Sequence, residues 1–405
     1  MIVSEPSNPW IAGIGNLYTT EFFEVCKERL GKEGLMVQWF HLYEMDDATF
    51  ELVVRTFHSV FPHVTMWQSL VADVLMIGSN SPMELDLENL RRKLSMEGIA
   101  RDLKRVQVAD VPTLLSLQMI SEENMPEFAG KGPVNTENLP LLEYWAPKAF
   151  YANRGASRIK RFDERLLFGK SSTLLNTYLK DRKLDPGELL NIGIYHSNLM
   201  SGTDRGNPVL GFAVMEEYLR RNPTDVRVLN LTKKMGERIG RRDDAARYHQ
   251  RLAELVPNDP EVLVEYGWDK FLGERLKATS VTGLSFDFYE KLFRRCIQLT
   301  GDTSFVYRAR LGDLYYAMQQ YGKAAKEYQR VLELQRNQGP IKGWRQDVFL
   351  FQLAWSLHAL GEESRAIGYA LQATMINPKH EEARDLVYAI WMQGSKPGPD
   401  TTRSH

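Results

Sequence analysis

Apolar residues in the first eighty positions fall into short runs separated by stripes of helical spacing. The runs at 1–3, 35–39, 64–67 and 71–77 have the length of buried strands. A helical stripe at 22–30 follows the first run, and another at 50–60 follows the second. The order is therefore strand, helix, strand, helix, strand, strand. It predicts the second half of an open α/β sheet closed by an antiparallel pair.

Capping residues and a proline set the limits of these elements. Thr19 or Thr20 can accept a hydrogen bond as the N-cap of the first helix, and Asp46 and Asp47 offer the same for the second. Pro62 ends the second helix, because proline has no backbone N–H to donate. Residues 68–70 leave a hairpin-like spacing between the last two strands.

Residues from about 85 to 165 are predicted to be mostly helical and loop-like. They contain the segment NTENLPLLEYWAPK at 135–148, which follows a Gly-Pro turn. We expect an extended stretch over 135–144.

From about residue 170 the pattern changes to helix after helix, and it repeats. Three residues recur 34 positions later: Gly206, Gly211 and Pro223 as Gly240, Ala245 and Pro257. A period of 34 residues is that of tetratricopeptide repeats. Small residues in such repeats allow two helices to cross closely, larger residues fill the gap between neighbouring pairs, and proline ends the second helix.

Two later stretches fit the same repeat. They are LGDLYYAMQQYGKAAKEYQRVLEL and LAWSLHALGEESRAIGYALQATMINP, and their equivalent residues Ala324 and Ala366 stand 42 positions apart. This spacing indicates an insertion of about eight residues near Gln338. We expect about five helix pairs, with an atypical one at 258–303 and a terminal helix near 381–392. An unrelated helical bundle is the alternative.

Composition and charge exclude several classes of function. The chain of 405 residues has a net charge of −1, so no overall field attracts nucleic acid, and no apolar run is long enough to cross a membrane. Its two cysteines, Cys26 and Cys296, cannot form a metal cluster, and His41, His58 and His63 lack carboxylate partners at ligand spacing. We expect a cytoplasmic protein with no bound metal and no nucleic-acid partner.

The N-terminal part resembles a known enzyme family. The blocks SEPSNPW at 4–10, DVLMIGS at 73–79 and NTENLPLLEYWAPK at 135–148 are similar to the C-terminal half of spermidine synthases, in particular to bacterial multidomain members. The resemblance implies half of a class I methyltransferase-like, Rossmann-type sheet. The predicted fold class is thus α/β followed by an all-α, tetratricopeptide-like solenoid. Relatives of this type often carry a membrane-spanning block before the synthase domain.

The same resemblance implies aminopropyl transfer from decarboxylated S-adenosylmethionine to a diamine such as putrescine. Glu5 falls at the catalytic carboxylate of the family's D-S-S-D-P motif, where it would orient the amine and accept its proton. Asn8 and Pro9 match the end of that motif, and Gln38 matches a glutamine near the substrate pocket. Glu5 is one methylene longer than aspartate and Asn8 lacks a charge, so another substrate or no catalysis is the alternative.

In that family the segments that bind the co-substrate precede the strand that comes first in this sequence. The resemblance therefore implies that this chain lacks the cofactor half, binds no cofactor and is inactive by itself. An apolar first strand without a neighbour is also predicted to form oligomers through its exposed edge.

A second hypothesis gives the chain no catalytic role. The repeats would be a scaffold whose concave groove binds a protein or peptide, and the α/β part would only cap it. A fragment without a function of its own is a third hypothesis. The predicted domains are the α/β part at 1–84, a helical extension at 85–168, the repeats at 169–395 and a disordered tail at 396–405.

Overall fold

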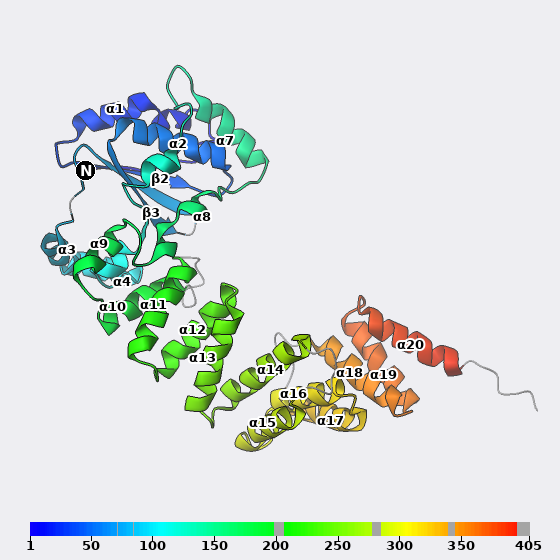
Figure 1. Cartoon of the computed structure of the whole chain (residues 1–405). Coiled ribbons are helices and arrows are strands. Elements are labelled where there is room, and N and C mark those ends of the chain that lie inside the picture. The colour runs from blue at the N-terminus through cyan, green and yellow to red at the C-terminus, as the bar shows by residue number, and fades with distance from the viewer. Residues whose placement is uncertain (71, 84, 198–205, 278–284, 339–344, 395–405) are drawn as a thin grey trace, which may run out of the picture. The chain divides into compact units, whose positions relative to one another are not determined.

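The computed structural model describes residues 1–70, 72–83, 85–197, 206–277, 285–338 and 345–394 (Figure 1). It divides the chain into two compact units, Met1–Ala245 and Ala246–His405, here called unit 1 and unit 2. The boundary falls inside the helix α13 (Arg242–Leu255). The predicted limits at 84/85 and 168/169 stay predictions, and the predicted tail at 396–405 lies outside the described residues.

Unit 1 contains a five-stranded sheet with the order β1-β2-β4-β3-β5. Its strands are β1 (Ile2–Ser4), β2 (Leu35–His41), β3 (His63–Leu70), β4 (Asp73–Ser79) and β5 (Gln118–Ile120). β1 pairs with β2 in parallel, and the other pairs are antiparallel. The predicted succession of elements is confirmed, but β4 inserts between β2 and β3. The third strand also runs through Leu70, so the hairpin turn comes later than predicted.

Helices α1 (Thr20–Arg29) and α2 (Asp47–Val60) pack against each other and cover one face of the sheet (Figure 1). Thr19 caps α1 by accepting a hydrogen bond from the backbone of Phe22, and Asp46 caps α2 in the same way from Thr49. The apolar stripes of both helices face the sheet. They form a core that includes the buried rings of Phe23, Phe40, Phe50 and Phe57.

The segment 135–148 closes this layer instead of running extended. Short helix η1 (Ile14–Tyr18) follows β1, and α7 (Leu141–Tyr151) lies against it. Asn135 is buried between them, and its Nδ2 donates to the backbone oxygens of Gly15 (3.2 Å) and Tyr18 (3.0 Å). Its Oδ1 accepts from the backbone N–H of Leu142 at 3.0 Å. One amide therefore joins the loop after β1 to the start of α7.

The rest of unit 1 is helical and includes short elements between and after the strands. These are α3 (Leu87–Leu94), α4 (Glu97–Arg105), α5 (Val111–Leu115), α6 (Met125–Ala129), α8 (Ile159–Phe162), η2 (Glu164–Leu167), α9 (Leu174–Asp181), α10 (Pro186–Ser197), α11 (Pro208–Arg221) and α12 (Val226–Arg238).

A buried polar network connects the sheet to these helices. Arg165 donates to Asp163 from Nε at 2.7 Å and from Nη2 at 2.6 Å, and its Nη1 donates to Gln68 of β3. Asn207, which caps α11, donates to the same Asp163 carboxylate at 2.9 Å. Because all four side chains are buried, each hydrogen bond offsets a desolvation cost that water does not compensate.

Unit 2 continues the helix pairs. It contains α14 (Pro260–Lys277), α15 (Phe286–Leu299), α16 (Phe305–Ala317), α17 (Tyr321–Gln338), α18 (Gln346–Ala359), α19 (Glu363–Ile376) and α20 (Glu381–Gly394). In the described residues, the five predicted pairs are therefore α10/α11 to α18/α19, and α20 is the predicted terminal helix. The predicted insertion after Gln338 lies outside the described residues.

The turns between paired helices share one backbone feature. Two residues before the second helix of a pair, φ is positive: 77° at Gly206, 79° at Gly240, 58° at Gln319 and 80° at Gly361. Left-handed backbone of this kind ends a helix and satisfies its last carbonyl groups, and glycine adopts it without strain. The recurrence of glycine after 34 residues therefore reflects a turn that the four pairs with described turns share.

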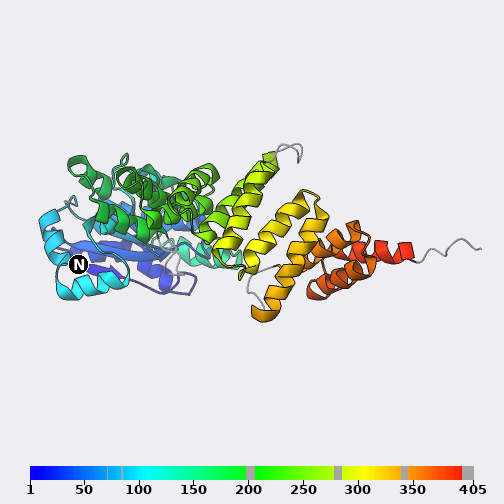
Figure 2. The same cartoon turned by 90° about the horizontal axis from the view of Figure 1, so that it is seen from below.

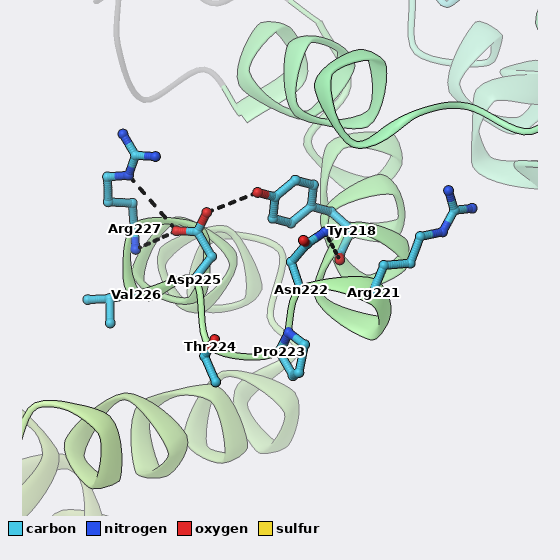
Figure 3. Close-up of a pocket in the computed structure, with 8 residues that line it drawn as sticks. All are labelled: Tyr218, Arg221, Asn222, Pro223, Thr224, Asp225, Val226 and Arg227. Carbon is cyan, nitrogen blue, oxygen red and sulfur yellow. Dashed lines mark hydrogen bonds and ion pairs between the residues drawn. The ribbon is translucent and has the colours of Figure 1, made fainter.

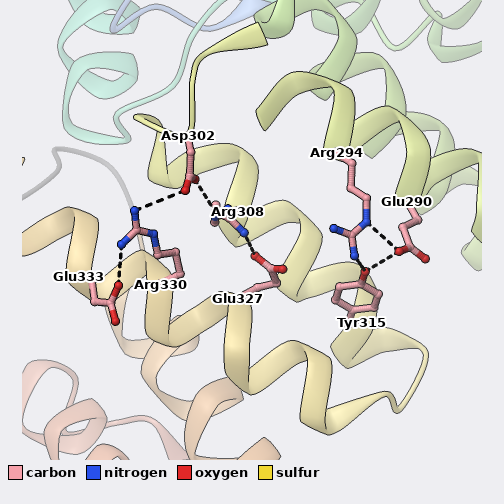
Figure 4. A network of polar contacts seen from close by, with 8 residues as sticks. All are labelled: Glu290, Arg294, Asp302, Arg308, Tyr315, Glu327, Arg330 and Glu333. Carbon is pink, nitrogen blue, oxygen red and sulfur yellow. Dashed lines mark hydrogen bonds and ion pairs between the residues drawn. The ribbon is translucent and has the colours of Figure 1, made fainter. Parts of the chain in front are cut away.

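Ion pairs hold the middle of unit 2 together (Figure 4). Arg308 of α16 donates to Asp302 from Nε at 2.6 Å and to Glu327 of α17 from Nη1 at 2.5 Å. These contacts raise the pKa of the Arg308 guanidinium and lower that of the Asp302 carboxyl group. Glu327 is buried, and the Arg308 guanidinium compensates part of the cost of removing its carboxylate from water.

Candidate functional site

The residues that the sequence predicts as an amine site lie at one end of the sheet. Glu5 follows β1 and is exposed, Asn8 is half-buried, and Pro9 is buried. Ser4 pairs with Gln38 across β1 and β2, so Glu5 and Gln38 are on neighbouring strands. Gln38 is buried, and its Nε2 donates to the adjacent backbone oxygen of Trp39 at 3.1 Å. A role of any of them in substrate contact stays a prediction.

The structure adds two residues to this end of the sheet that sequence reasoning did not select. Asp73 begins β4 and pairs with His41 of β2. Burial and the nearby charge of Glu5 raise the pKa of Asp73. Burial lowers the pKa of His41 to about 4, its Nδ1 lies 2.8 Å from the backbone oxygen of Tyr43, and its ring contacts Trp10 at 4.9 Å. Only the strand register, which is not readable from the sequence, brings Asp73 beside His41.

The pair of Ser116 and His196 resembles a catalytic serine–histidine pair, but it is closed to solvent. The Oγ of Ser116 lies 2.8 Å from the Nε2 of His196, and both residues are buried. The adjoining cavity encloses about 10 Å³, which admits at most one water molecule. No substrate reaches this pair, so it is part of the core.

An open hollow of about 530 Å³ lies at the turn between α11 and α12 (Figure 3). Tyr218, Asn222 and Asp225 in its lining already have hydrogen-bond partners. The Tyr218 hydroxyl donates to Asp225 Oδ2 at 2.9 Å, and Asp225 Oδ1 accepts from the backbone of Arg227 at 3.1 Å. Asp225 is also the N-cap of α12. The hollow is therefore the outside of a helix turn rather than a site built for a ligand.

The helices of unit 2 form two layers, and one of them carries the candidate site. α14 packs on α16, α16 on α18, and α18 on α20, while α15, α17 and α19 pack between them. The first series is called the inner layer below. Three inner helices have an equivalent buried leucine in their core face: Leu311 in α16, Leu353 in α18 and Leu386 in α20.

These leucines define equivalent positions of the repeat. Two residues after each leucine stand Asp313, Trp355 and Tyr388. Two residues beyond a leucine on a helix is a rotation of about 200°, so this position points away from the core face. Trp355 is 38% exposed and Tyr388 is 60% exposed, although both are large and partly apolar.

The position five residues after each leucine is aromatic or imidazole. It is occupied by Tyr316, His358 and Trp391, and Trp391 is 63% exposed. Burial raises the pKa of Tyr316 to about 12, and Glu382 of α20 adds to this while Arg275 of α14 opposes it. The hydroxyl of Tyr316 therefore lies within electrostatic reach of the helices on both sides. The inner layer brings these side chains toward a shared surface.

At the N-terminal end of this surface the charges are already neutralised. The Arg310 guanidinium lies over the ring of Trp268, 4.3 Å from its centroid. Arg310 also pairs with Asp313 at 3.3 Å, and Asp313 accepts a hydrogen bond from the Tyr328 hydroxyl at 2.9 Å. What remains available is mostly ring surface. We call Trp268, Tyr316, Trp355, Tyr388 and Trp391 the aromatic stripe.

Among the comparisons with known proteins, one family model matches a segment of unit 2. The sequence model of the tetratricopeptide repeat family matches residues 307–338. That segment covers most of α16 and all of α17, and Tyr316 of the aromatic stripe lies in it. No curated protein matches the chain.

Several solved structures are similar at low identity. A crystal structure of MamA has 15% identity and a TM-score of 0.36, over 53% of this chain and 100% of its own. TTC0263, a thermophilic TPR protein of Thermus thermophilus, has 14% identity and a TM-score of 0.33, over 51% of this chain and 100% of its own. YrrB, described as a TPR protein with an unusual peptide-binding site, has 10% identity and a TM-score of 0.38, over 53% and 98%. Likeness at this level carries no argument about function.

The predicted resemblance to spermidine synthases is wrong. The family whose sequence model matches is the tetratricopeptide repeat, over residues 307–338. The segment that suggested the enzyme family has a structural task. Asn135 closes the loop after β1, and Glu143 accepts a hydrogen bond from the backbone of Gly13 at 2.8 Å. Decarboxylated S-adenosylmethionine and a diamine followed only from that resemblance, so neither is proposed.

In the part of the chain that the structure describes, no group of three His, Cys, Asp or Glu side chains could hold a metal ion. Cys26 and Cys296 are both free and buried. Among the described helices, none has the length and apolar character needed to cross a membrane.

Proposed function

We propose that this protein is an interaction scaffold that holds a segment of a partner protein on the inner layer of its repeats. The observation that carries the proposal is the exposure of Trp355 and Tyr388 at equivalent repeat positions of α18 and α20. Exposed aromatic residues on a rigid surface are the typical energetic centres of protein interfaces. A helical stack supplies the rigidity, because each pair is fixed by its neighbours.

The chemistry of the stripe favours a segment with apolar side chains. Arg310 and Asp313 neutralise each other, so the surface presents rings rather than an uncompensated charge. Aromatic rings bury large areas at low entropic cost, and the hydroxyl of Tyr388 can hydrogen-bond to a peptide backbone. A phosphate backbone would instead require a row of cations.

Peptide selection tests this proposal directly. A library of displayed peptides is selected against the whole chain, and the affinity of the best peptides is measured by fluorescence anisotropy. We expect the selected peptides to share apolar anchors. The Trp355→Ala variant, combined with Tyr388→Ala, should weaken binding by about a thousandfold, because buried aromatic anchors are worth about 2 kcal/mol or more each.

A matched control separates the inner layer from apolar exposure in general. Met375 of α19 is 81% exposed and does not belong to the inner layer. Met375→Ala should leave the affinity unchanged, and circular dichroism should show all variants folded. Equal affinity of the wild type and the Trp355→Ala, Tyr388→Ala variant would contradict the proposal.

We also propose a finer description of the sheet in unit 1. It is the C-terminal half of a class I methyltransferase-like sheet. Supporting this, β1 and β2 are parallel strands joined by α1, and the reversed strand β4 stands between β2 and β3. The proposal concerns topology and assigns no activity. An experimental structure with β4 at the sheet edge would contradict it.

A further inference from the structure

Helices α3 and α4 stand apart from the core of unit 1. Neither contains a single buried residue. They contact each other, α3 also contacts α5, and both lie at the periphery of the unit in two views (Figure 1, Figure 2). A nine-residue helix is marginal in water unless one face is covered. The exposed face of α4 therefore needs an explanation.

That face is an apolar stripe. Met96, Ile99, Leu103 and Val106 follow one another at spacings of three and four residues, which places them on one side of the helix. Met96 is 55% exposed, and Ile99 and Val106 are each 39% exposed. We call these four residues the α4 stripe. None of the four is buried.

The segment from the second half of α3 to the end of α4 is strongly basic. Residues 91–105 contain six lysines and arginines and two acidic residues, a net charge of +4, whereas the whole chain has −1. Arg101 and Arg105 share the single carboxylate of Asp102, at 3.9 and 3.7 Å. Their side chains are 73% and 78% exposed, so these contacts leave most of the positive charge available.

We propose that α4 docks on an anionic lipid surface, with the α4 stripe in the headgroup–acyl boundary and the basic residues at the phosphates. An apolar stripe flanked by lysine and arginine is the composition of interfacial helices. Two contributions to the binding free energy then act on the same helix. Apolar burial removes the stripe from water, and the negative surface potential attracts the cations. The bilayer also covers the face that unit 1 leaves exposed.

Charge decides between a bilayer and other occupants. A protein partner on the α4 stripe would need acidic groups around an apolar centre, and nothing in unit 1 points to one. A nucleic acid would use the cations but would leave the α4 stripe in water. An anionic bilayer satisfies both the stripe and the basic flanks at once.

Vesicle co-sedimentation of the full chain tests the proposal. The two probes are vesicles of pure phosphatidylcholine and vesicles with about one third phosphatidylserine. We expect binding to the second kind only, lost at high salt because the attraction is screened. Neutralising two cations in the Lys104→Gln, Arg105→Gln variant should lower the partition coefficient at least tenfold, since each contributes about a fivefold factor. Met96→Gln with Ile99→Gln should lower it as well.

Two controls make the outcome decisive. Met375→Gln removes an apolar residue of unit 2 that is even more exposed, and Arg227→Gln removes a cation that is 90% exposed; neither should change vesicle binding. All changed positions are exposed, so the variants should keep the wild-type circular dichroism. No binding to phosphatidylserine vesicles would overturn the proposal. Binding that the Met96→Gln, Ile99→Gln variant retains, or that inorganic phosphate or duplex RNA displaces, would overturn it too.

Discussion

The Nε2 atom of His196 lies 2.8 Å from the Oγ atom of Ser116, inside unit 1. The other ring nitrogen accepts a hydrogen bond from the backbone N–H of Asn207 at 2.8 Å. An accepting Nδ1 has no proton, so the ring is neutral and donates from Nε2. Burial, and secondarily the charge of Arg165, hold the pKa of His196 well below its ordinary value.

This relationship predicts that unit 1 loses stability in mild acid. The unfolded chain binds a proton at each histidine near pH 6.5, whereas folded His196 stays neutral. Stability is therefore complete above about pH 6.5 and falls as the pH decreases below it, by about 1.4 kcal/mol per pH unit for each such residue. His41, with its pKa lowered to about 4, acts in the same direction. Urea unfolding at pH 7.5 and 5.5 measures the effect.

The expected result is a lower urea midpoint at pH 5.5. The His196→Gln variant should be less stable at both pH values and should show a shallower pH dependence, because one titrating group is gone. Identical midpoints for the wild-type chain at pH 7.5 and 5.5 would rule out the argument.

Gly312 is predicted to tolerate no larger side chain. A Cβ there would lie 2.6 Å from Cε1 of Tyr328, and the ring cannot turn aside because its hydroxyl is bound to Asp313. Gly312→Ala should destabilise unit 2 by about 1–3 kcal/mol, as overpacking of a core does. Thermal unfolding followed by circular dichroism measures the change.

Gly368 of α19 is the matched control for this substitution. It has open space where a Cβ would stand. Gly368→Ala should raise stability by about 0.5–1 kcal/mol, because alanine has the higher helix propensity. The opposite order of the two variants would show that the contact with Tyr328 does not limit position 312.

Gln319 occupies the turn position that glycine holds in other pairs. Its φ of 58° is strained for a side chain with a Cβ, whereas glycine adopts this conformation freely. Gln319→Gly should therefore stabilise unit 2 by about 1 kcal/mol. Gln319→Ala keeps the Cβ and should give no such gain. A stability series of these variants in guanidinium chloride decides the matter, and equal effects of both would refute it.

Arg308 is predicted to be the costliest surface-facing cation to remove from unit 2. Arg308→Met leaves the buried carboxylate of Glu327 without its partner, which should cost about 2–3 kcal/mol. Adding Glu327→Gln should recover a large part of that loss. Arg330 lies 3.4 Å from Asp302 but is 43% exposed, so Arg330→Met should cost well under about 1 kcal/mol.

The measurement is a double-mutant cycle of Arg308 and Glu327 by chemical unfolding. A coupling free energy of about 1 kcal/mol or more is expected. Additive effects would mean that solvent already screens the pair.

The sequence predicts the early elements of the fold because their signals are local. Thr19 and Asp46 are N-caps in the structure as the pattern predicts. The place of β4 between β2 and β3 could not be predicted, because apolar periodicity identifies strands but not their neighbours. For the same reason, the pairing of Asp73 with His41 could not be predicted from the sequence.

The repeats were predictable as a class, but the candidate site on them was not. Trp355 and Tyr388 have the size and spacing of core residues, and only the packing of the inner layer shows that both are exposed. The turn at Gln319 has no glycine, so the sequence does not show it, whereas glycine marks the equivalent turn in other pairs. The enzyme resemblance failed for a related reason. The segment containing Asn135 looks like a family signature, yet its amide serves loop closure.

The inner layer has a mechanical consequence. In the described part of unit 2, the main contacts of each helix from α14 to α20 are with the helices next to it in the stack. Such a stack deforms elastically. Small rotations at successive helix junctions add up, while the packing within each helix pair stays intact. The distance between Trp268 and Tyr388 then changes as the stack bends or twists. A bound segment that spans both rings fixes that length and stiffens the whole unit.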